Sequence, residues 1–440
     1  MHRIGLILIL FFSVNSYSQE TFTSKNVEDT SYKLYTEKKW KELTAFGNKA
    51  VAEGFDYYYL RMRIGIAYYE QKNYRAAQKH FRKASRFNSS EDVMKEYLYY
   101  CYLYNEQYDH AKKLTKQFSP ELAKKLETDR SPVIDFMMLE GGVKSTSRAD
   151  LSNAYYGQYG IGHHIGKNVS FFHAITLFDQ KGTSQSLDQK QYYLSASVPV
   201  KTSWLISPAF HYLNKTVLNQ TVITRVDTIW KMGMPHVIPP PWAPPLKTNT
   251  VVITNSTKSQ SNYYIGSMEI KRSISRFDMG ACATISNIDS ISQTQGDFFV
   301  SYFPFGNNKL ILTSTAFMQK ESVAPDLKYA FLQSASVSLS KKINLSANFL
   351  LNQAHHLNEM NGYLANNSSD LTTSRITLMG NFILSRHINA YVLYQVENKE
   401  QNVPPKGNPS PPGHPVPPHT PTQTTTYSYN NFFAGLKIIL

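Results

Sequence analysis

Cysteines and long hydrophobic runs are both scarce in this sequence. Its 440 residues include two cysteines, Cys101 and Cys282, which lie in regions of different composition and therefore predict no disulfide framework. The apolar run from Ile4 to Val14 has about eleven residues, whereas a membrane-spanning helix needs roughly twenty. If the chain crosses a membrane, a closed β-barrel is the form that remains, because backbone polar groups in lipid must be paired within the protein.

The common motifs of cofactor and catalytic sites are also missing. The sequence has no phosphate-binding glycine loop, no paired-cysteine metal motif and no nucleophile elbow, so it predicts no cofactor, no metal site and no catalytic residue. The formal net charge of +14 is spread along both halves without a dense basic block. This distribution argues against a nucleic-acid partner and favours a basic surface near anionic lipid headgroups.

The first residues have the order of a secretory signal peptide. A charged start at Met1-His2-Arg3 precedes the apolar run, and a short polar stretch ends at Ser18-Gln19. We therefore expect residues 1–18 to be a signal peptide and the rest of the chain to be exported. A glutamine after the cleavage point resembles exported proteins of the Bacteroidota.

Residues 19–130 show helical spacing of apolar and aromatic side chains, as in "YRAAQKHFRKA". Trp40, Tyr74 and Tyr108 are each 34 residues apart, which is the period of the tetratricopeptide repeat. The middle unit resembles this family best, since Gly65 and Ala77 are small where its two helices should cross. The units on either side depart from the pattern, as terminal repeats often do.

The resemblance implies a peptide- or protein-binding groove lined by the first helix of each unit. The residues that map to this groove are tyrosines, whose rings offer a large, stiff contact area with a polar tip. An equally weighted alternative is that these tyrosines pack within the domain, or that the groove rests on the barrel. The candidate partner-binding residues are Tyr32, Tyr35, Tyr59, Tyr69, Tyr100 and Tyr104.

From residue 131 to 440 the pattern changes to strands with one apolar and one polar face. In "INLSANFLLN", Ile343, Leu345 and Phe349 alternate with polar residues. Fourteen such strands can be placed, most of about ten residues, and their connections alternate between short and long. Short periplasmic turns and longer outer loops are typical of outer-membrane barrels. The fold class expected is therefore α + β multidomain: helical repeats, then a transmembrane antiparallel barrel of about fourteen strands.

Two long proline-rich connections, 217–260 and 401–424, are predicted to be extracellular loops. The last strand, ending "NNFFAGLKIIL", resembles the C-terminal targeting strand of outer-membrane barrels. A further connection, 355–370, holds His355, His356, Glu359, Ser368, Ser369 and Asp370, and is expected to be an outer loop. A hydrolase site in this loop is the alternative that would make the protein an enzyme.

The whole plan resembles surface-lipoprotein translocators and the YaiO-like outer-membrane proteins. This resemblance implies a non-enzymatic outer-membrane protein whose periplasmic repeats bind a client or assembly partner for export or display. The expected partners are that periplasmic or exported protein, outer-membrane lipid and the barrel-assembly machinery. The rival hypothesis is a passive or substrate-selective pore, with the repeats as a docking module.

Overall fold

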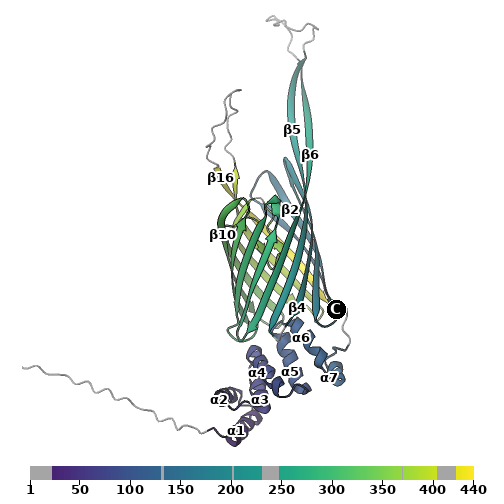
Figure 1. Ribbon diagram of the computed structural model, residues 1–440. Coiled ribbons are helices and arrows are strands. Elements are labelled where there is room, and N and C mark those ends of the chain that lie inside the picture. Colours follow the sequence, from purple (N-terminus) through teal and green to yellow (C-terminus); the bar gives the residue numbers. More distant parts are fainter. Residues whose placement is uncertain (1–21, 130–132, 201–202, 230–246, 369, 404–422) are drawn as a thin grey trace, which may run out of the picture.

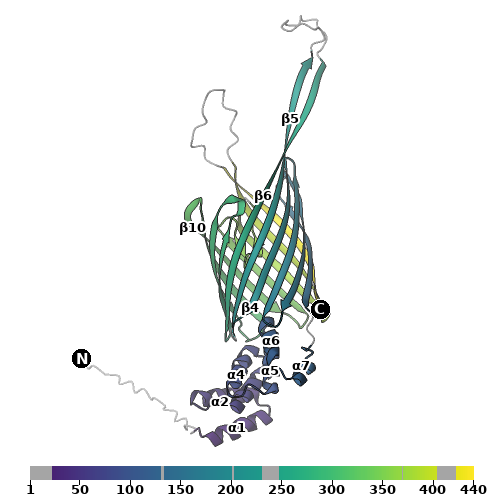
Figure 2. The same cartoon turned by 45° about the vertical axis from the view of Figure 1, so that its right-hand side comes forward.

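The computed structural model describes residues 22–129, 133–200, 203–229, 247–368, 370–403 and 423–440. A group of helices lies against one end of a closed β-barrel (Figures 1 and 2). The predicted signal peptide, 1–18, lies outside the described residues. None of the helices in the described ranges is long and apolar enough to cross a membrane.

The described N-terminal residues form seven α-helices: α1 (Ser24–Thr36), α2 (Trp40–Ala52), α3 (Tyr58–Glu70), α4 (Tyr74–Phe87), α5 (Asp92–Tyr104), α6 (Tyr108–Leu114) and α7 (Pro120–Lys125). The first six make three pairs, and equivalent helices begin 34 residues apart. The turn within each pair also repeats, because Lys38, Lys72 and Glu106 all have a positive φ of 56–59°. The predicted period is therefore confirmed as a helical repeat.

Close helix crossing in the middle pair depends on a glycine, as the spacing predicted. A Cβ on Gly65 would lie 2.6 Å from the Cε1 atom of Phe81, so a larger residue could not keep this contact. Phe81, Ala77 and Cys101 are fully buried in the same apolar cluster. Asn73 caps the start of α4, since its side chain accepts a hydrogen bond from the Ala76 amide.

The barrel has fourteen antiparallel strands, which confirms the predicted number. They are β1 (Ile134–Thr146), β2 (Leu151–Ile165), β3 (Val169–Gly182), β4 (Gln185–Pro199), β5 (Trp204–Ile229), β6 (Lys247–Ile274), β7 (Phe277–Ser286), β8 (Gln293–Tyr302), β9 (Leu310–Glu321), β10 (Ala324–Ser338), β11 (Ile343–Asn352), β14 (Leu371–Ile383), β15 (Ile388–Val403) and β16 (Gln423–Ile439). Each strand pairs with its chain neighbours, and β16 closes the barrel on β1.

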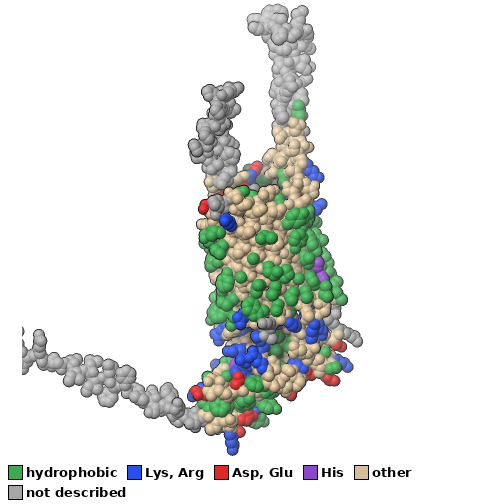
Figure 3. All heavy atoms as spheres, in the orientation of Figure 1, with side chains coloured by type: hydrophobic (Ala, Val, Ile, Leu, Met, Phe, Trp, Pro, Cys, Tyr) green, Lys and Arg blue, Asp and Glu red, His purple; other side chains and the backbone are tan. Residues whose placement is uncertain are grey.

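The two faces of the wall differ as the alternation predicted. On β16, Phe432, Leu436 and Ile438 are exposed on the outside, whereas Asn431, the neighbour of Phe432, is fully buried on the lumen side. The same apolar exterior continues around the barrel, and Figure 3 shows it as a broad green area. Other exposed apolar side chains of the wall include Tyr159, Leu177, Phe210, Ile270, Phe298, Met318, Phe331, Leu351 and Leu378.

Two predicted loops need correction. Residues 217–229 and 247–260 are not a loop, because β5 and β6 stay paired as far as Ile229 and Lys247 and extend beyond the rest of the barrel (Figure 1). The alternation of Thr, Val and Ile there favours a strand, and the prolines lie in 230–246, outside the described residues. Most of the second loop, residues 404–422, also lies outside them. The third connection, 355–370, does not stay outside the barrel.

Candidate functional site

The connection between β11 and β14 crosses the barrel lumen. It contains two short strands, β12 (Asn358–Glu359) and β13 (Leu364–Ala365), which pair with each other. Its tip binds β4 and β5, which lie six or seven strands away from β11 and β14 around the fourteen-strand barrel. Strands half a circumference apart face each other, so this lumen loop, residues 353–368, spans the interior from one wall to the other.

Backbone and amide groups hold the tip of the lumen loop. Asn361 donates from Nδ2 to the Ser207 carbonyl at 2.9 Å, and its own carbonyl accepts from Ser267 Oγ at 2.8 Å. The Gly362 carbonyl accepts from His211 Nδ1 at 2.8 Å. Gly362 has a φ of +75°, which a side chain would strain, so this glycine shapes the turn at the tip.

A buried ion pair joins the middle of the loop to the wall. Arg375 on β14 donates from both terminal nitrogens to the two oxygens of Glu359, at 2.8 and 2.6 Å. The side chain of Glu359 is 4 % exposed and that of Arg375 is 14 % exposed. A bidentate geometry gives both strength and orientation to such a pair. Loss of either partner would leave a charge buried without its counter-ion.

His356, the histidine of the possible hydrolase site, contacts groups that hold the lumen loop in place. His356 Nε2 lies 3.6 Å from Asp289 Oδ2, and its Nδ1 lies 3.2 Å from the carbonyl of Asn366. Asp370 accepts a hydrogen bond from the Tyr427 hydroxyl at 2.6 Å, toward the wall. The contacts described for His356 thus tie the loop to its surroundings, and they include no serine nucleophile.

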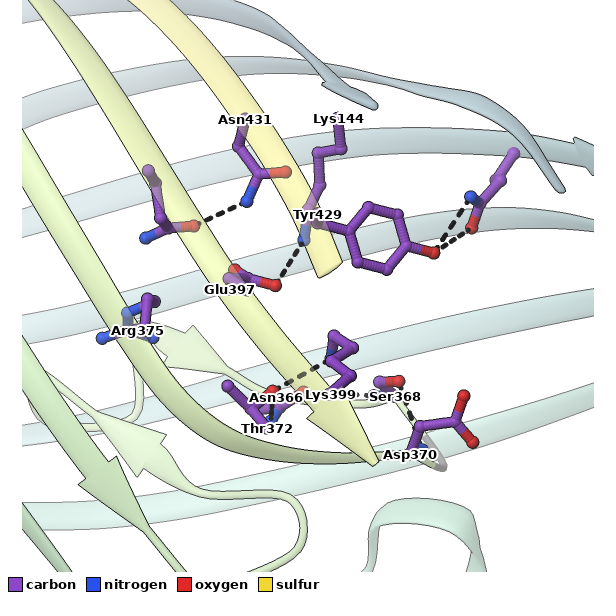
Figure 4. A network of polar contacts seen from close by, with 12 residues as sticks. Lys144, Asn366, Ser368, Asp370, Thr372, Arg375, Glu397, Lys399, Tyr429 and Asn431 are labelled. Carbon is purple, nitrogen blue, oxygen red and sulfur yellow. Dashed lines mark hydrogen bonds and ion pairs between the residues drawn. The ribbon is translucent and has the colours of Figure 1, made fainter. Parts of the chain in front are cut away.

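Further polar groups surround the base of the lumen loop (Figure 4). Lys399 donates to Thr372 Oγ1 at 2.9 Å, and the loop residue Asn366 donates to the same atom at 3.0 Å. Lys144 lies 3.4 Å from Glu397, across the seam where the barrel closes. The lumen wall near the loop is therefore lined by charged and amide side chains, several of which pair with one another.

Part of the lumen below the loop remains hollow. A cavity of about 450 Å³ lies between the loop and the helical end of the barrel. Glu269, Lys271 and Asp278 bring charge to it, and Phe299 and Met360 bring apolar surface. This mixed lining is compatible with a passing solute or with water.

The helical domain is docked on the rim at the other end of the barrel. Arg75 at the start of α4 donates to both oxygens of Asp278 on β7, at 2.7 and 3.0 Å. Its guanidinium carbon lies 3.3 Å from the centre of the Phe303 ring, and its backbone amide donates to the Gly306 carbonyl at 3.0 Å. One residue thus bridges the start of β7 and the turn between β8 and β9.

Helix α6 and the turn before it extend the contact to β1. Lys112 Nζ lies 2.6 Å from Asp135 Oδ1, and Lys113 donates to the Pro199 carbonyl at 2.7 Å. Other polar contacts join Asp109 to Ser170, Gln107 to Ser273 and the Lys72 carbonyl to Asn307. The helices therefore contact the rim continuously from β1 to the turn between β8 and β9.

Three of the six predicted groove tyrosines lie together. Tyr104 is 6.1 Å from Tyr100 and 6.2 Å from Tyr69, measured between ring centres. Tyr74 and Tyr97 complete this tyrosine cluster, at 4.5 Å from Tyr104 and 5.1 Å from Tyr69. Burial raises the pKa of Tyr69 far above its usual value, and the hydroxyl of Tyr104 adds to the effect.

The other three candidates differ in their surroundings. Tyr35 packs edge-on against Trp40, with 6.0 Å between ring centres, and lies against the same apolar core as Tyr69 and Tyr97. Tyr32 is 55 % exposed and lies under the Arg63 guanidinium, and Tyr59 is 63 % exposed beside Tyr58. Three candidates thus form a cluster, Tyr35 packs on the same core, and Tyr32 and Tyr59 lie apart.

The sequence did not reveal the residues that join the helical domain to the barrel. Arg75 and Asp278 are 203 positions apart, and no local pattern links them. Within the described ranges, no cluster of three or more His, Cys, Asp or Glu residues is arranged to hold a metal ion.

Comparison with known proteins identifies no family for this chain. No protein-family profile and no curated protein matches the chain. Among solved structures, a FadL homologue from Pseudomonas aeruginosa is 7 % identical, with a TM-score of 0.42 over 70 % of this chain and 90 % of that one. The Pseudomonas putida toluene transporter TodX is 6 % identical in sequence, with a TM-score of 0.42 over 70 % of this chain and 90 % of that one. Omp33 of Acinetobacter baumannii is 7 % identical in sequence, with a TM-score of 0.33 over 70 % of this chain and 100 % of that one. These values are too low to bear on function.

Proposed function

We propose that this chain is a non-enzymatic outer-membrane channel that is selective for its substrate and is kept closed by its lumen loop. The helical domain serves as its periplasmic docking module. Of the two functions that the sequence leaves open, this one follows most directly from the arrangement of the loop. A passive pore would need an unobstructed lumen, whereas this lumen is crossed by a bonded segment.

The placement in a membrane rests on the surface of the barrel. Its exterior is apolar all around, as expected for a wall in contact with lipid, and its interior is polar. Closure of β16 on β1 leaves no unpaired strand edge where all fourteen strands form the wall. The helices lie at the end opposite the three longest connections, 230–246, 353–370 and 404–422, and in outer-membrane barrels the longer loops face outward and the other end faces the periplasm.

The observation that carries the channel proposal is the lumen loop with its Arg375–Glu359 pair. The loop is bonded at its tip, at its middle and at its base, so it has one defined position. A purely structural filler would be satisfied by apolar packing, whereas a buried charge pair is retained at a cost in desolvation. Such a pair suits a segment that must leave its place when a substrate or partner competes for its groups.

The test is the ion conductance of the purified full-length protein in planar lipid bilayers. One variant has residues 356–364 replaced by a short Gly-Ser turn, and the control variant has the connection 404–422 shortened by the same number of residues. We expect low conductance from the natural protein and from the control, and a steady conductance from the loop variant. Equal, steady conductance from all three would show a passive pore, and no conductance from the loop variant would contradict a channel.

A second function, the binding of a protein client, is favoured by the tyrosine cluster. Tyr104 is 46 % exposed at its edge, beside the turn that contacts the rim, where a periplasmic polypeptide could be held. A photoreactive residue at position 104, compared with one at the exposed but separate Tyr59, tests it in living cells. Capture of one exported protein from position 104 and not from position 59 is expected. Capture of the barrel alone would contradict client binding.

A further inference from the structure

A basic cleft lies between helix α4 and the rim of the barrel. It has a volume of about 250 Å³ and is lined on one side by α4 and on the other by the turns that join β4 to β5 and β6 to β7. Six of its lining residues are basic: Arg75, Lys79, Arg82, Lys83, Arg86 and Arg272. None of the lining residues is acidic. Figure 3 shows Lys and Arg side chains gathered at this level, where the helices meet the barrel.

The basic residues of α4 form one stripe along the helix. Positions 75, 79, 82, 83 and 86 follow a spacing of three and four, which places side chains on one face. Helix α4 contains no Asp or Glu that could pair with them within a turn. The stripe therefore brings several positive charges to one small space beside the paired Arg75, which favours the binding of an anion there.

Arg75 supplies a donor that points to a missing ligand. Its side chain is 2 % exposed and its two terminal nitrogens are used by Asp278. Its Nε atom is buried without any hydrogen-bond partner among the described residues. Arg75 lines the cleft, so an acceptor oxygen bound there could satisfy this donor.

The cleft lies directly below the apolar exterior of the barrel. Ile270, Ile274 and Phe277 on the same strands are each exposed by 41–42 % on the outer wall. Arg272 lies between the two isoleucines, and its guanidinium is 4.9 Å from the ring centre of Trp204. An Arg stacked on a Trp at the end of an apolar wall is typical of the level at which lipid headgroups begin.

We propose that this cleft binds the phosphate of an anionic phospholipid in the periplasmic leaflet of the membrane. Arg272 and the serines of the rim turns contact the headgroup from the barrel side, and Lys79, Lys83 and Arg86 contact it from the helix. The acyl chains lie along the apolar wall beside Ile274. The bound lipid thereby joins the helical domain to the barrel. This inference rests on the proposed placement in the outer membrane.

The test is native mass spectrometry of the full-length protein, released from uncharged detergent micelles and titrated with phosphatidylglycerol, phosphatidylcholine or inorganic phosphate. The variant is Lys79→Gln with Lys83→Gln, and the control is Lys33→Gln with Lys41→Gln, two exposed lysines on α1 and α2. We expect phosphatidylglycerol to bind preferentially. Each cation removed from the cleft should weaken its binding roughly fivefold, hence about 25-fold for the pair, with little change in the control.

Three results would overturn the lipid site. Equal binding of the two lipids would show no anion preference, and equal losses in variant and control would show a diffuse charge effect. Tight binding of inorganic phosphate at the concentrations used for the lipid would show a site for a free anion. Insertion into liposomes is measured in parallel: failure to insert would contradict the proposed membrane placement, whereas insertion without lipid preference would contradict the cleft alone.

Discussion

The lumen loop and the helical domain are each attached to the barrel wall by an ion pair between an arginine and a carboxylate. The surroundings of the two attachments differ. The Arg375–Glu359 pair lies inside the lumen among buried amides, and the loop is tied to strands at both of its ends. The Arg75–Asp278 pair is helped by contacts at the rim, such as Lys112–Asp135, whose side chains are 21 % and 28 % exposed. Exposed pairs are screened by salt, whereas buried pairs are screened much less.

Because of this difference, we expect the release of the lumen loop and the undocking of the helical domain to respond to different conditions. Release of the lumen loop requires that a buried charge pair be separated, so a competing ligand or partner is needed. Undocking of the helical domain also separates a buried pair, Arg75–Asp278, but its other contacts include the partly exposed Lys112–Asp135 pair, so ionic strength affects part of its docking.

The largest effect is expected from Glu359→Ala. It leaves Arg375 charged and buried, which costs roughly 3–5 kcal/mol and should free the loop. Hydrogen exchange of residues 355–366 in the full-length protein would report the change as lost protection. The double variant Glu359→Leu with Arg375→Met removes both charges and should restore much of the protection. Equal exchange in both variants would contradict a role for the charge pair.

Asp278→Ala should loosen the helical domain by roughly 2–4 kcal/mol, because Arg75 loses its partner while it remains buried. Hydrogen exchange at the start of α4 and at the turn between β8 and β9 measures this loss. The lumen loop should keep its protection. Exchange that rises equally in the loop would mean that the two attachments are not independent. In the natural protein, 0.5 M salt should affect the rim contacts more than the loop.

Acid should destabilise the helical domain through His80. Burial and the neighbouring Arg61 lower the pKa of His80 from 6.5 to about 3, and the Arg61 guanidinium donates toward its Nδ1 at 3.3 Å. In the unfolded chain His80 is protonated below pH 6.5, whereas in the folded chain it stays neutral down to about pH 3. The free energy of unfolding therefore falls as the pH drops from 6.5 toward 3. The loss is roughly 1.4 kcal/mol per pH unit. Hydrogen exchange in α3 and α4, corrected for intrinsic rates, should show this slope, and His80→Gln should reduce it. An unchanged slope in the His80→Gln variant would show that His80 is not the cause of the acid sensitivity.

The smallest effect is expected from Lys125→Met. Lys125 pairs with Glu96 at 2.7 Å, but its side chain is 61 % exposed, so the pair should contribute less than about 0.5 kcal/mol. Thermal unfolding of the helices, followed by circular dichroism, should give a midpoint within error of the natural protein. A clear shift would show that exposed pairs in this domain are stronger than their solvation suggests.

The regular parts of the molecule could be predicted because their periods are local. The 34-residue spacing of Trp40, Tyr74 and Tyr108 marked the starts of α2, α4 and α6. Alternation in "INLSANFLLN" marked β11 and its two faces. Both signals arise because each side chain faces a defined medium, and a period of 3.6 or 2 then repeats along the chain.

The candidate site was predicted only in part. The polar stretch 355–370 looks the same whether water or a polar lumen satisfies its groups, so its composition could not show that it enters the barrel. Tyr69, Tyr100 and Tyr104 were found together because helical spacing aligned them, whereas Tyr32 and Tyr59 share that spacing but not the cluster. The basic stripe on α4 was visible in the sequence, but not the rim that turns it into a cleft.

The sequence by itself determined the helical repeat, the number of strands and the apolar exterior, because these depend on neighbours a few residues apart and on the solvent that each face meets. Only the tertiary structure decided that Glu359 meets Arg375 in the lumen, and that Arg75 meets Asp278 on the rim. Those contacts join residues whose meeting depends on barrel closure and on the direction in which a loop turns. No period in the chain encodes either of these.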